Sequence, residues 1–391
     1  MNKPIFAVII GLICLTVAGP LSANAEGVNI QGFISQGYLK TDQNNYLAET
    51  DDGSFQFNEM GINFTTFVSD KLKMGCQFFA RDLGTVGNDD IVVNWAFAEY
   101  GFRNWMGVRV GLIKIPFGFY NDLRDFDSLR PSILLPSSVY NEWVRDSFNS
   151  MKGFELYGLV DIGGLGDIGY QLQAGEIQVP LDSGTGKYIL EIISGGLDSL
   201  TKIKIDKAYV ARLIWTTPLD GLRIGGSFVF SGSSIEGGRG EIPISLRSDP
   251  SNFTVFSIEY IYQNLKIAVE NFWVKNDQTI LTDLSGLGLG NTTQKSKNDT
   301  NDSFYISLGY RFADWFEAAY YYSDYIQNED LKGDENKLRD QCFSFRFDIN
   351  PNWLVKLETH LMNGEFGVSP DDDGHTYNEW MLYAVKVSYS F

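Results

Sequence analysis

The sequence has few of the residues that hold small secreted domains or metal centres together. It contains three cysteines and two histidines in 391 residues, and only Cys76 and Cys342 lie beyond residue 25. This scarcity excludes a disulfide framework, and the wide spacing of these residues gives no zinc motif. The two cysteines fall on opposite faces of their predicted strands, so we expect free thiols.

Long apolar runs and excess positive charge are also missing. After residue 25 no apolar run approaches the ~18 residues that would predict a membrane-spanning helix. Acidic residues outnumber basic ones by 49 to 31, a net charge of −18, and this argues against nucleic-acid binding, which depends on clustered positive charge. His360 and His375 have no nucleophile beside them in a recognisable motif. We therefore expect no enzymatic activity, no cofactor and no metal site.

The first 25 residues have the features of an export signal. Lys3 precedes an almost unbroken apolar run over Ile5–Ala18, and Ala23, Asn24 and Ala25 form a small-x-small cleavage site. The apolar run is too short for a spanning helix. We expect a cleaved signal peptide over 1–25 and a single domain over 26–391.

The rest of the chain alternates between apolar and polar residues with a period of two. Ser303–Phe312 is the clearest case, with Phe304, Ile306 and Leu308 on one face. Short turns alternate with long polar connections, as in an antiparallel barrel that crosses a membrane. About sixteen candidate strands can be counted, near 28–39, 54–68, 71–82, 91–102, 106–115, 152–160, 167–175, 205–216, 221–231, 252–262, 264–275, 302–312, 315–326, 341–349, 353–363 and 380–391.

Three features favour a membrane barrel over a soluble β-sandwich. The non-apolar face of the strands is charged, which suits a water-filled lumen better than a buried core. Aromatic residues such as Trp353, Trp380 and Tyr320–Tyr322 recur at strand ends, as in interfacial girdles. The chain also stops on an alternating strand with a terminal aromatic, Phe391. The predicted fold is all-β: a transmembrane antiparallel barrel of about sixteen strands, wide enough for an aqueous channel.

One connection, over about 116–151, is long, charged and aromatic, and has neither helical nor strand periodicity. It follows the strand that begins at Met106 and is broken by Pro116 and Gly118. Such a segment is neither a core element nor a flexible tail. We expect it to fold into the lumen and narrow it.

The residues around this connection resemble a known family. The run from Val108 to Gly118, VRVGLIKIPFG, resembles the strand that leads into the constriction loop of bacterial outer-membrane porins. The continuation through 120–140 is similar to proteobacterial porins related to the phosphate-selective and dicarboxylate types. The resemblance implies an outer-membrane location in a Gram-negative bacterium and a homotrimer. The end of the chain, with Tyr389 and Phe391, resembles the signal read by the barrel assembly machinery.

In such a pore a few lining charges decide which ions pass, because low-dielectric walls focus their field. Loop and wall charges could form a transverse field, or the loop charges could pair with each other and only hold its shape. Six basic against three acidic wall positions tilt the expectation weakly towards anions. The predicted constriction comprises Arg109, Asp122, Arg124, Asp125, Asp127, Arg130, Glu142 and Arg145. The predicted lumen wall includes Arg81, Arg223, Arg311, Arg346 and Lys356.

Three functions remain open at this point. The first is a porin for passive diffusion of small hydrophilic solutes and ions. The second is a substrate-specific channel for small anions or sugars, in which the loop aromatics would contact the solute instead of packing the loop. The third is a non-conducting structural or adhesive barrel. All three predict contact with outer-membrane lipid and lipopolysaccharide.

Overall fold

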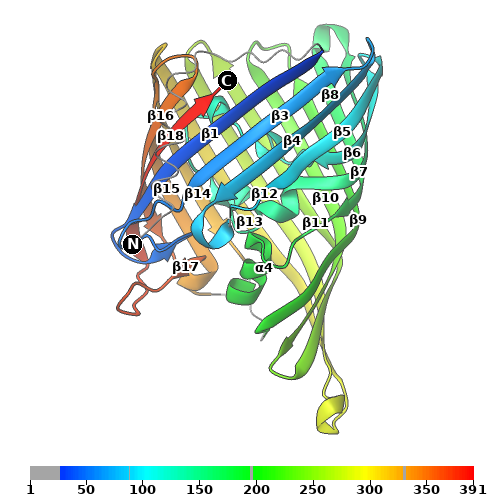
Figure 1. The fold of residues 1–391 in the computed structure, drawn as a ribbon, viewed down its shortest axis with the longest axis vertical. Helices are drawn as coiled ribbons and strands as arrows, with labels where there is room; N and C mark the ends of the chain where they lie inside the picture. Colours follow the sequence, from blue (N-terminus) through cyan, green and yellow to red (C-terminus); the bar gives the residue numbers. More distant parts are fainter. Residues whose placement is uncertain (1–26, 88, 194–196, 329–331) are drawn as a thin grey trace.

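Sixteen antiparallel strands form a closed barrel in the computed structural model, which describes residues 27–87, 89–193, 197–328 and 332–391 (Figure 1). Each strand pairs with the next along the chain, and β1 closes the cylinder against β18. The barrel strands are β1 (Val28–Thr41), β3 (Asn58–Phe67), β4 (Leu72–Asp82), β5 (Val92–Arg103), β6 (Met106–Lys114), β7 (Ser150–Asp161), β8 (Asp167–Ile177), β9 (Ser199–Thr216), β10 (Leu222–Arg239), β11 (Ile242–Tyr262), β12 (Leu265–Thr282), β13 (Thr292–Ala313), β14 (Phe316–Ile326), β15 (Lys337–Asp348), β16 (Trp353–Asn363) and β18 (Glu379–Ser390).

The remaining elements are short and lie in the connections. None of the helices in the described residues has the length and apolar character needed to cross a membrane. These elements are the strand pair β2 (Asn45–Tyr46) and β17 (Val368–Ser369), the α-helices α2 (Ser137–Tyr140), α3 (Arg145–Asn149) and α4 (Gly184–Tyr188), the π-helix η5 (Ile189–Ile193), and the 3₁₀ helices η1 (Gly84–Val86), η2 (Asn121–Leu123), η3 (Asp127–Leu129), η4 (Gly163–Leu165), η6 (Ser285–Leu287) and η7 (Asp334–Asn336).

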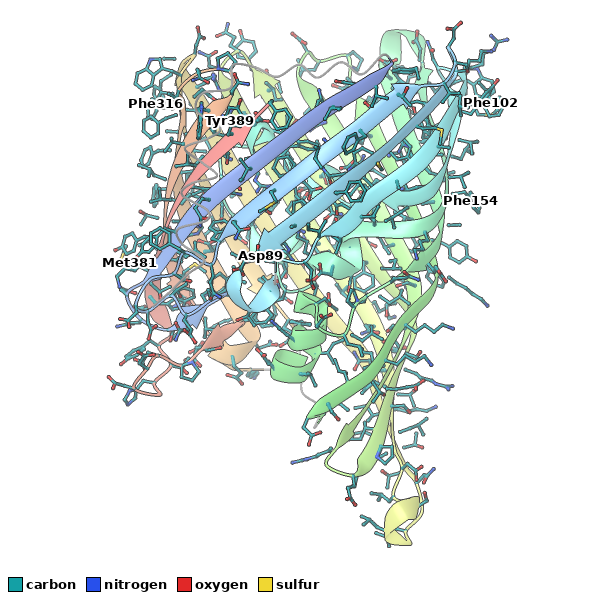
Figure 2. The ribbon with its side chains drawn as sticks, in the orientation of Figure 1. Asp89, Phe102, Phe154, Phe316, Met381 and Tyr389 are labelled. Atoms are coloured by element: carbon teal, nitrogen blue, oxygen red, sulfur yellow. The ribbon has the colours of Figure 1, made fainter. Side chains whose placement is uncertain are left out.

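The predicted alternation separates an apolar outer face from a polar lumen. On β13, Phe304, Ile306 and Leu308 are 39–47% exposed, whereas Tyr305 between them is 1% exposed and faces inward. Figure 2 shows outer aromatics such as Phe102 and Phe154 pointing away from the ribbon. An outer surface of this kind is stable only against lipid, since water would solvate it poorly. The sixteen-stranded barrel fold is confirmed.

Strands β9–β13 are longer than predicted and project beyond the other strands at the lower end of Figure 1. The extra residues lie in segments expected to be polar loops, such as 232–251. Ser231 and Ser233 of β10 pair with Ser251 and Ser248 of β11, so β11 holds one extra residue there, and such a bulge interrupts the alternation on which the prediction relied. Beyond this shift Ile244 and Leu246 are buried and belong to a small apolar cluster with Ile189.

Two predicted girdle aromatics lie inside the barrel instead. Trp380 is buried, and its indole N–H donates to the Gly364 carbonyl at 3.1 Å. Tyr321 is also buried, and its hydroxyl donates to Asp340 at 2.8 Å. Both cysteines are free, as expected: Cys76 faces outward and Cys342 is buried on the lumen side.

Candidate pore constriction

The segment between β6 and β7 folds into the lumen, as predicted, and contacts the wall in several directions. The two ends of the loop are joined by a backbone hydrogen bond, in which the Ile115 N–H donates to the Asn149 carbonyl at 3.1 Å. Gly118 has φ of +58°, a left-handed conformation that suits glycine. The Gly118 N–H donates to the Ser227 hydroxyl of β10 at 3.0 Å, so the loop crosses towards the far wall at once. Strand β7 begins at Ser150, one residue before the predicted end of the loop at 151.

On that far wall the loop is held by one buried carboxylate, Glu270 of β12. The Phe119 N–H donates to it at 2.9 Å, and the hydroxyl of Tyr305 on β13 donates at 2.7 Å. The hydroxyls of Tyr140 in α2 and Ser257 on β11 also donate to it. Several donors compensate the charge that burial removes from water. Neither composition nor spacing distinguished Glu270 among the acidic residues.

The opposite side of the loop is held by a network of buried ion pairs centred on Arg145. Its guanidinium donates to Glu59 of β3 at 2.9 Å and to Asp125 at 2.7 Å, and lies 3.5 Å from Glu142. Glu142 also pairs with Arg124 at 2.6 Å and with Arg81 of β4 at 2.8 Å. Loop charges therefore pair both within the loop and across to the wall.

These pairs keep the loop carboxylates ionised although they are buried. Burial alone would raise the pKa of Asp125, but the charges of Lys114 and Arg145 outweigh it and hold that pKa well below its ordinary value. Burial also disfavours the charged form of Glu142, and Arg124 and the other neighbouring arginines lower the Glu142 pKa in the same way.

A third anchor fixes the loop around Asp127. Lys386 of β18 lies 2.9 Å from its carboxylate, and Lys356 of β16 donates to its backbone carbonyl at 2.7 Å. Arg130 pairs with the same carboxylate at 3.3 Å. Arg346 of β15 donates to the Arg130 carbonyl at 3.3 Å. Lys386 lies on the inward face that alternation predicts, although it was not among the predicted wall residues.

Asp122 makes the fourth anchor, with an arginine that the sequence reasoning missed. Arg212 of β9 donates to both Asp122 oxygens, at 3.0 and 2.7 Å. A bidentate pair of this kind fixes orientation as well as distance. Lys207, five residues earlier, has φ of +56° and marks an irregularity in β9 that obscures the alternation. Reading the faces from the last residues of the strand would have placed Arg212 inward.

The other predicted arginines lie on the wall with acidic neighbours. Arg109 pairs with two other wall residues, Glu99 of β5 at 2.6 Å and Glu155 of β7 at 2.5 Å. Arg223 pairs with Glu259 at 2.6 Å and lies over the Phe119 ring, 4.4 Å from its centroid. Arg311 pairs with Asp348 and Glu317, at 2.6 and 3.4 Å.

The structure revises two expectations about the constriction, namely its preference for anions and the role of its aromatic residues. The described wall carries more charged groups of both signs than alternation picked out, among them Glu59, Glu270 and Asp340 but also Arg212 and Lys386, so the six-to-three count no longer supports anion preference. The loop aromatics Phe117 and Tyr140 are buried. This arrangement favours packing of the loop over solute contact for these rings.

One group of wall residues has the donor atoms of a metal site. Donor atoms of Cys342, Glu358 and His360 all lie within 4.8 Å of one another, because β15 and β16 pair Cys342 with His360. Their separation in the sequence hid this proximity. Glu358 also accepts the Ile133 N–H at 2.6 Å, and His360 contacts Asp340 at 3.0 Å. Hydrogen bonding alone therefore accounts for the group.

Cavities lie on both sides of the loop. One of about 580 Å³ opens towards the long connections and is lined by residues such as Val139, Phe253 and Asn276. Another of about 730 Å³ lies at the end with the short turns and is lined by residues such as Arg346 and Asp348. We call them the long-loop cavity and the short-turn cavity.

The barrel resembles solved outer-membrane proteins over almost its whole length. The outer membrane channel DcaP of Acinetobacter baumannii has a TM-score of 0.54 and 9% identity, with 93% of this chain and 97% of that chain covered. OmpF of Salmonella typhi, solved with daunomycin, has a TM-score of 0.58 and 13% identity, with 93% and 97% covered. The anion-selective porin of Comamonas acidovorans has a TM-score of 0.51 and 10% identity, with 93% and 99% covered.

These likenesses show that the chain has the porin type of barrel. No protein-family model matches the sequence, and no curated protein matches it either.

Proposed function

We propose that the protein is an outer-membrane porin of a Gram-negative bacterium, through which small hydrophilic solutes and ions diffuse passively. The observation that carries the proposal is a barrel with an apolar outer face and a loop across its lumen, with cavities of about 580 and 730 Å³ on the two sides of that loop. A structural barrel would not need cavities that approach the same constriction from both ends.

The finer features of the proposal come from the sequence and from what its resemblance to porins implies. Residues 1–25, which lie outside the described residues, would be removed as a signal peptide. The mature chain would be one domain and would assemble as a homotrimer. Tyr389 and Phe391 would serve as the assembly signal for insertion among outer-membrane lipid and lipopolysaccharide. The solved OmpT of Vibrio cholerae, a barrel of the same type, is described in a trimer form, which supports the homotrimer.

We also assign the constriction to the loop and the wall residues that hold it. The loop members would be Asp122, Arg124, Asp125, Asp127, Arg130, Glu142 and Arg145, and Arg109 would be a wall member whose own ion-pair partners, Glu99 and Glu155, are wall residues too. The protein needs no catalytic group or cofactor for this role. His360 is buried between Asp340 and Glu358 and lines neither of the two cavities.

Solute flux into proteoliposomes tests the proposal. Vesicles that contain the refolded protein should swell in solutions of small sugars and amino acids, at rates that fall as solute size increases. Protein denatured before reconstitution is the control. Absence of swelling from a folded, heat-modifiable barrel would contradict the porin proposal and favour a structural role.

A further inference from the structure

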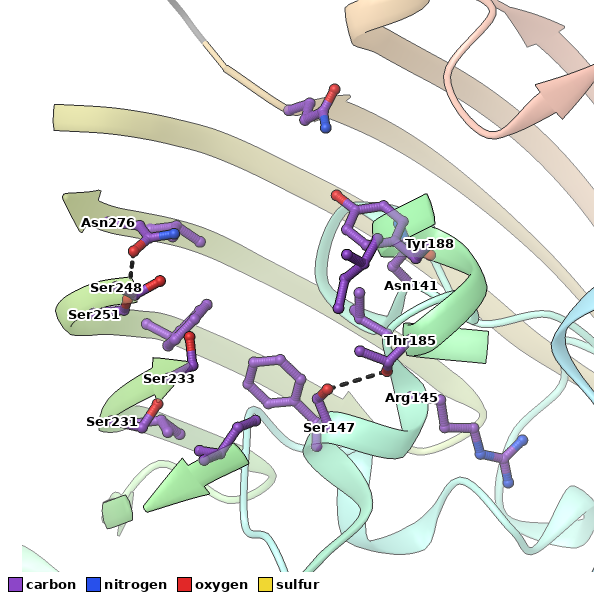
Figure 3. A pocket seen from close by; sticks show the side chains of 18 of the residues that line it. Asn141, Arg145, Ser147, Thr185, Tyr188, Ser231, Ser233, Ser248, Ser251 and Asn276 are labelled. Atoms are coloured by element: carbon purple, nitrogen blue, oxygen red, sulfur yellow. Dashed lines mark hydrogen bonds between the residues drawn. The ribbon is translucent and has the colours of Figure 1, made fainter. Parts of the chain in front are cut away.

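The long-loop cavity differs from the water-filled lumen that a porin requires. On one side it is bounded by inward-facing residues of β10–β12, including Ser231, Ser251 and Asn276. On the other side lie Ser147 of α3 and Thr185 of α4 (Figure 3). Its volume of about 580 Å³ is in the range of small-molecule sites, which is roughly 300–1,000 Å³.

Much of the wall of this cavity is apolar where a porin lumen is polar. Ile235, Phe253 and Val274 come from three adjacent strands, line it and are partly exposed. Phe148 of the loop completes this surface, since its ring lies 5.3 Å from the Phe253 ring. Water gains little from such a surface, whereas an apolar solute is stabilised when it leaves water there.

The polar groups of the cavity carry no available charge. Among the described residues that line it, the charged ones are Arg124 and Arg145, and both are buried and paired with carboxylates. In Figure 3 the guanidinium of Arg145 points away from the cavity. The other polar groups are hydroxyls and amides, such as Ser233 and Asn141.

The short-turn cavity shows the contrast. Its lining includes Arg311 and Asp348, whose side chains are paired but remain 35% and 22% exposed, so an ion finds accessible charges there. A charged solute in the long-loop cavity would lose water without gaining an unpaired counter-ion. A neutral solute would not incur this cost.

We propose that the long-loop cavity is a binding site for a neutral amphipathic small molecule, with an apolar ring or branched body and one or more hydroxyl or carbonyl groups. The body would lie against Ile235, Phe253 and Val274, and the polar groups would meet the hydroxyls and amides of the wall. The proposal rests on the porin function above and gives it a solute class: molecules that this channel concentrates at its long-loop end before they pass the loop.

Equilibrium binding to the full-length purified protein tests this proposal, with three probes of similar size. The probes are 4-nitrobenzyl alcohol, which is neutral and amphipathic, 4-nitrobenzoate, which is charged, and glucose, which is neutral without an apolar body. Ser233→Phe would fill the cavity. Ser234→Phe is the matched control, because the next residue of β10 faces away from the lumen. Heat-modifiable migration and circular dichroism verify that both variants fold.

We expect saturable binding of the alcohol to the wild type and to Ser234→Phe, with binding to Ser233→Phe weaker by about tenfold or more. We expect the benzoate and glucose to bind more weakly than the alcohol. Equal binding of the alcohol to both variants would place it outside the cavity and overturn the proposal. Tighter binding of the benzoate would overturn the neutral preference.

Binding and flux are measured separately, so the two proposals can fail separately. A protein that binds the alcohol but supports no vesicle swelling would contradict the porin function and leave the site standing. A protein that supports swelling but does not bind the alcohol would contradict the site and leave the porin function standing.

Discussion

Replacing Arg145 by methionine should loosen the constriction loop, because this side chain joins the loop to the barrel wall. Its guanidinium lies within 3.5 Å of three carboxylates, those of Glu59, Asp125 and Glu142. Methionine keeps much of the apolar stem and removes the charge. Removing one partner of a buried ion pair typically costs about 3–5 kcal/mol, since the remaining charge stays buried.

The structure places the expected cost near the lower end of that range. Each of the three carboxylates keeps another cation: Glu59 keeps Lys386 at 2.5 Å, Asp125 keeps Lys114 at 2.6 Å, and Glu142 keeps Arg81 at 2.8 Å. The network then holds one positive charge fewer but leaves no carboxylate alone. We expect a loss of about 3 kcal/mol in the free energy of unfolding.

Two measurements check this expectation. Urea unfolding in lipid vesicles gives the change in free energy. A nitroxide at Leu129→Cys, with Cys76 and Cys342 replaced by alanine, reports loop mobility by electron paramagnetic resonance. Leu129 is half exposed on the loop, so the label disturbs little packing.

The control is an ion pair outside the loop. Lys202 and Glu236 are 2.8 Å apart and both 49% exposed. Lys202→Met should therefore change stability by only about 0–1 kcal/mol and leave the label immobile. If Arg145→Met costs no more than Lys202→Met and the label does not become more mobile, the inference that buried ion pairs hold the loop is wrong.

Three other perturbations test the same anchors. The neighbouring arginines lower the pKa of Glu142, so its contribution to the free energy of unfolding is fully present above its unfolded pKa of about 4.3 and is lost as pH falls through the lower folded value. The nitroxide should therefore stay immobile from pH 8 to about 5. Loosening of the loop within that range would contradict this assignment. Gly118→Ala places a methyl group 2.3 Å from the Tyr140 hydroxyl oxygen at a positive φ and should cost about 1–3 kcal/mol in urea unfolding, whereas Gly101→Ala, which meets nothing within 4 Å, is the control and should cost less. Tyr140→Phe removes a hydroxyl that donates to the Glu270 carboxylate and should cost about 1.5–3 kcal/mol by the same measurement; a cost within error of zero would mean that this bond does not stabilise the loop.

Period-two alternation was sufficient to predict the barrel and most of its strands. It depends only on which face of a strand meets lipid, and that preference acts on every second residue. The prediction failed where an extra residue changed the face, as between Ser248 and Ser251 of β11 and near Lys207 of β9. The inward course of the 116–151 connection was also predictable, because no other place suits a long charged segment in such a barrel.

The partners of the loop charges could not be predicted from the sequence. Arg212 and Glu270 contact the loop from strands that lie 90 and 151 residues away along the chain from Asp122 and Phe119. Which charges meet across a lumen depends on strand register and loop conformation together, and alternation fixes neither. The apolar lining of the long-loop cavity was missed for the same reason, since residues such as Ile280 lie in segments that were expected to be loops.

Single-channel conductance in a planar bilayer tests most directly whether the loop constricts a water-filled channel. The wild type should give discrete conductance steps, and a variant in which residues 119–147 are replaced by a short glycine-serine linker should give steps several-fold larger. Equal conductance from the two folded proteins would contradict the constriction, and a silent wild type would contradict the channel itself.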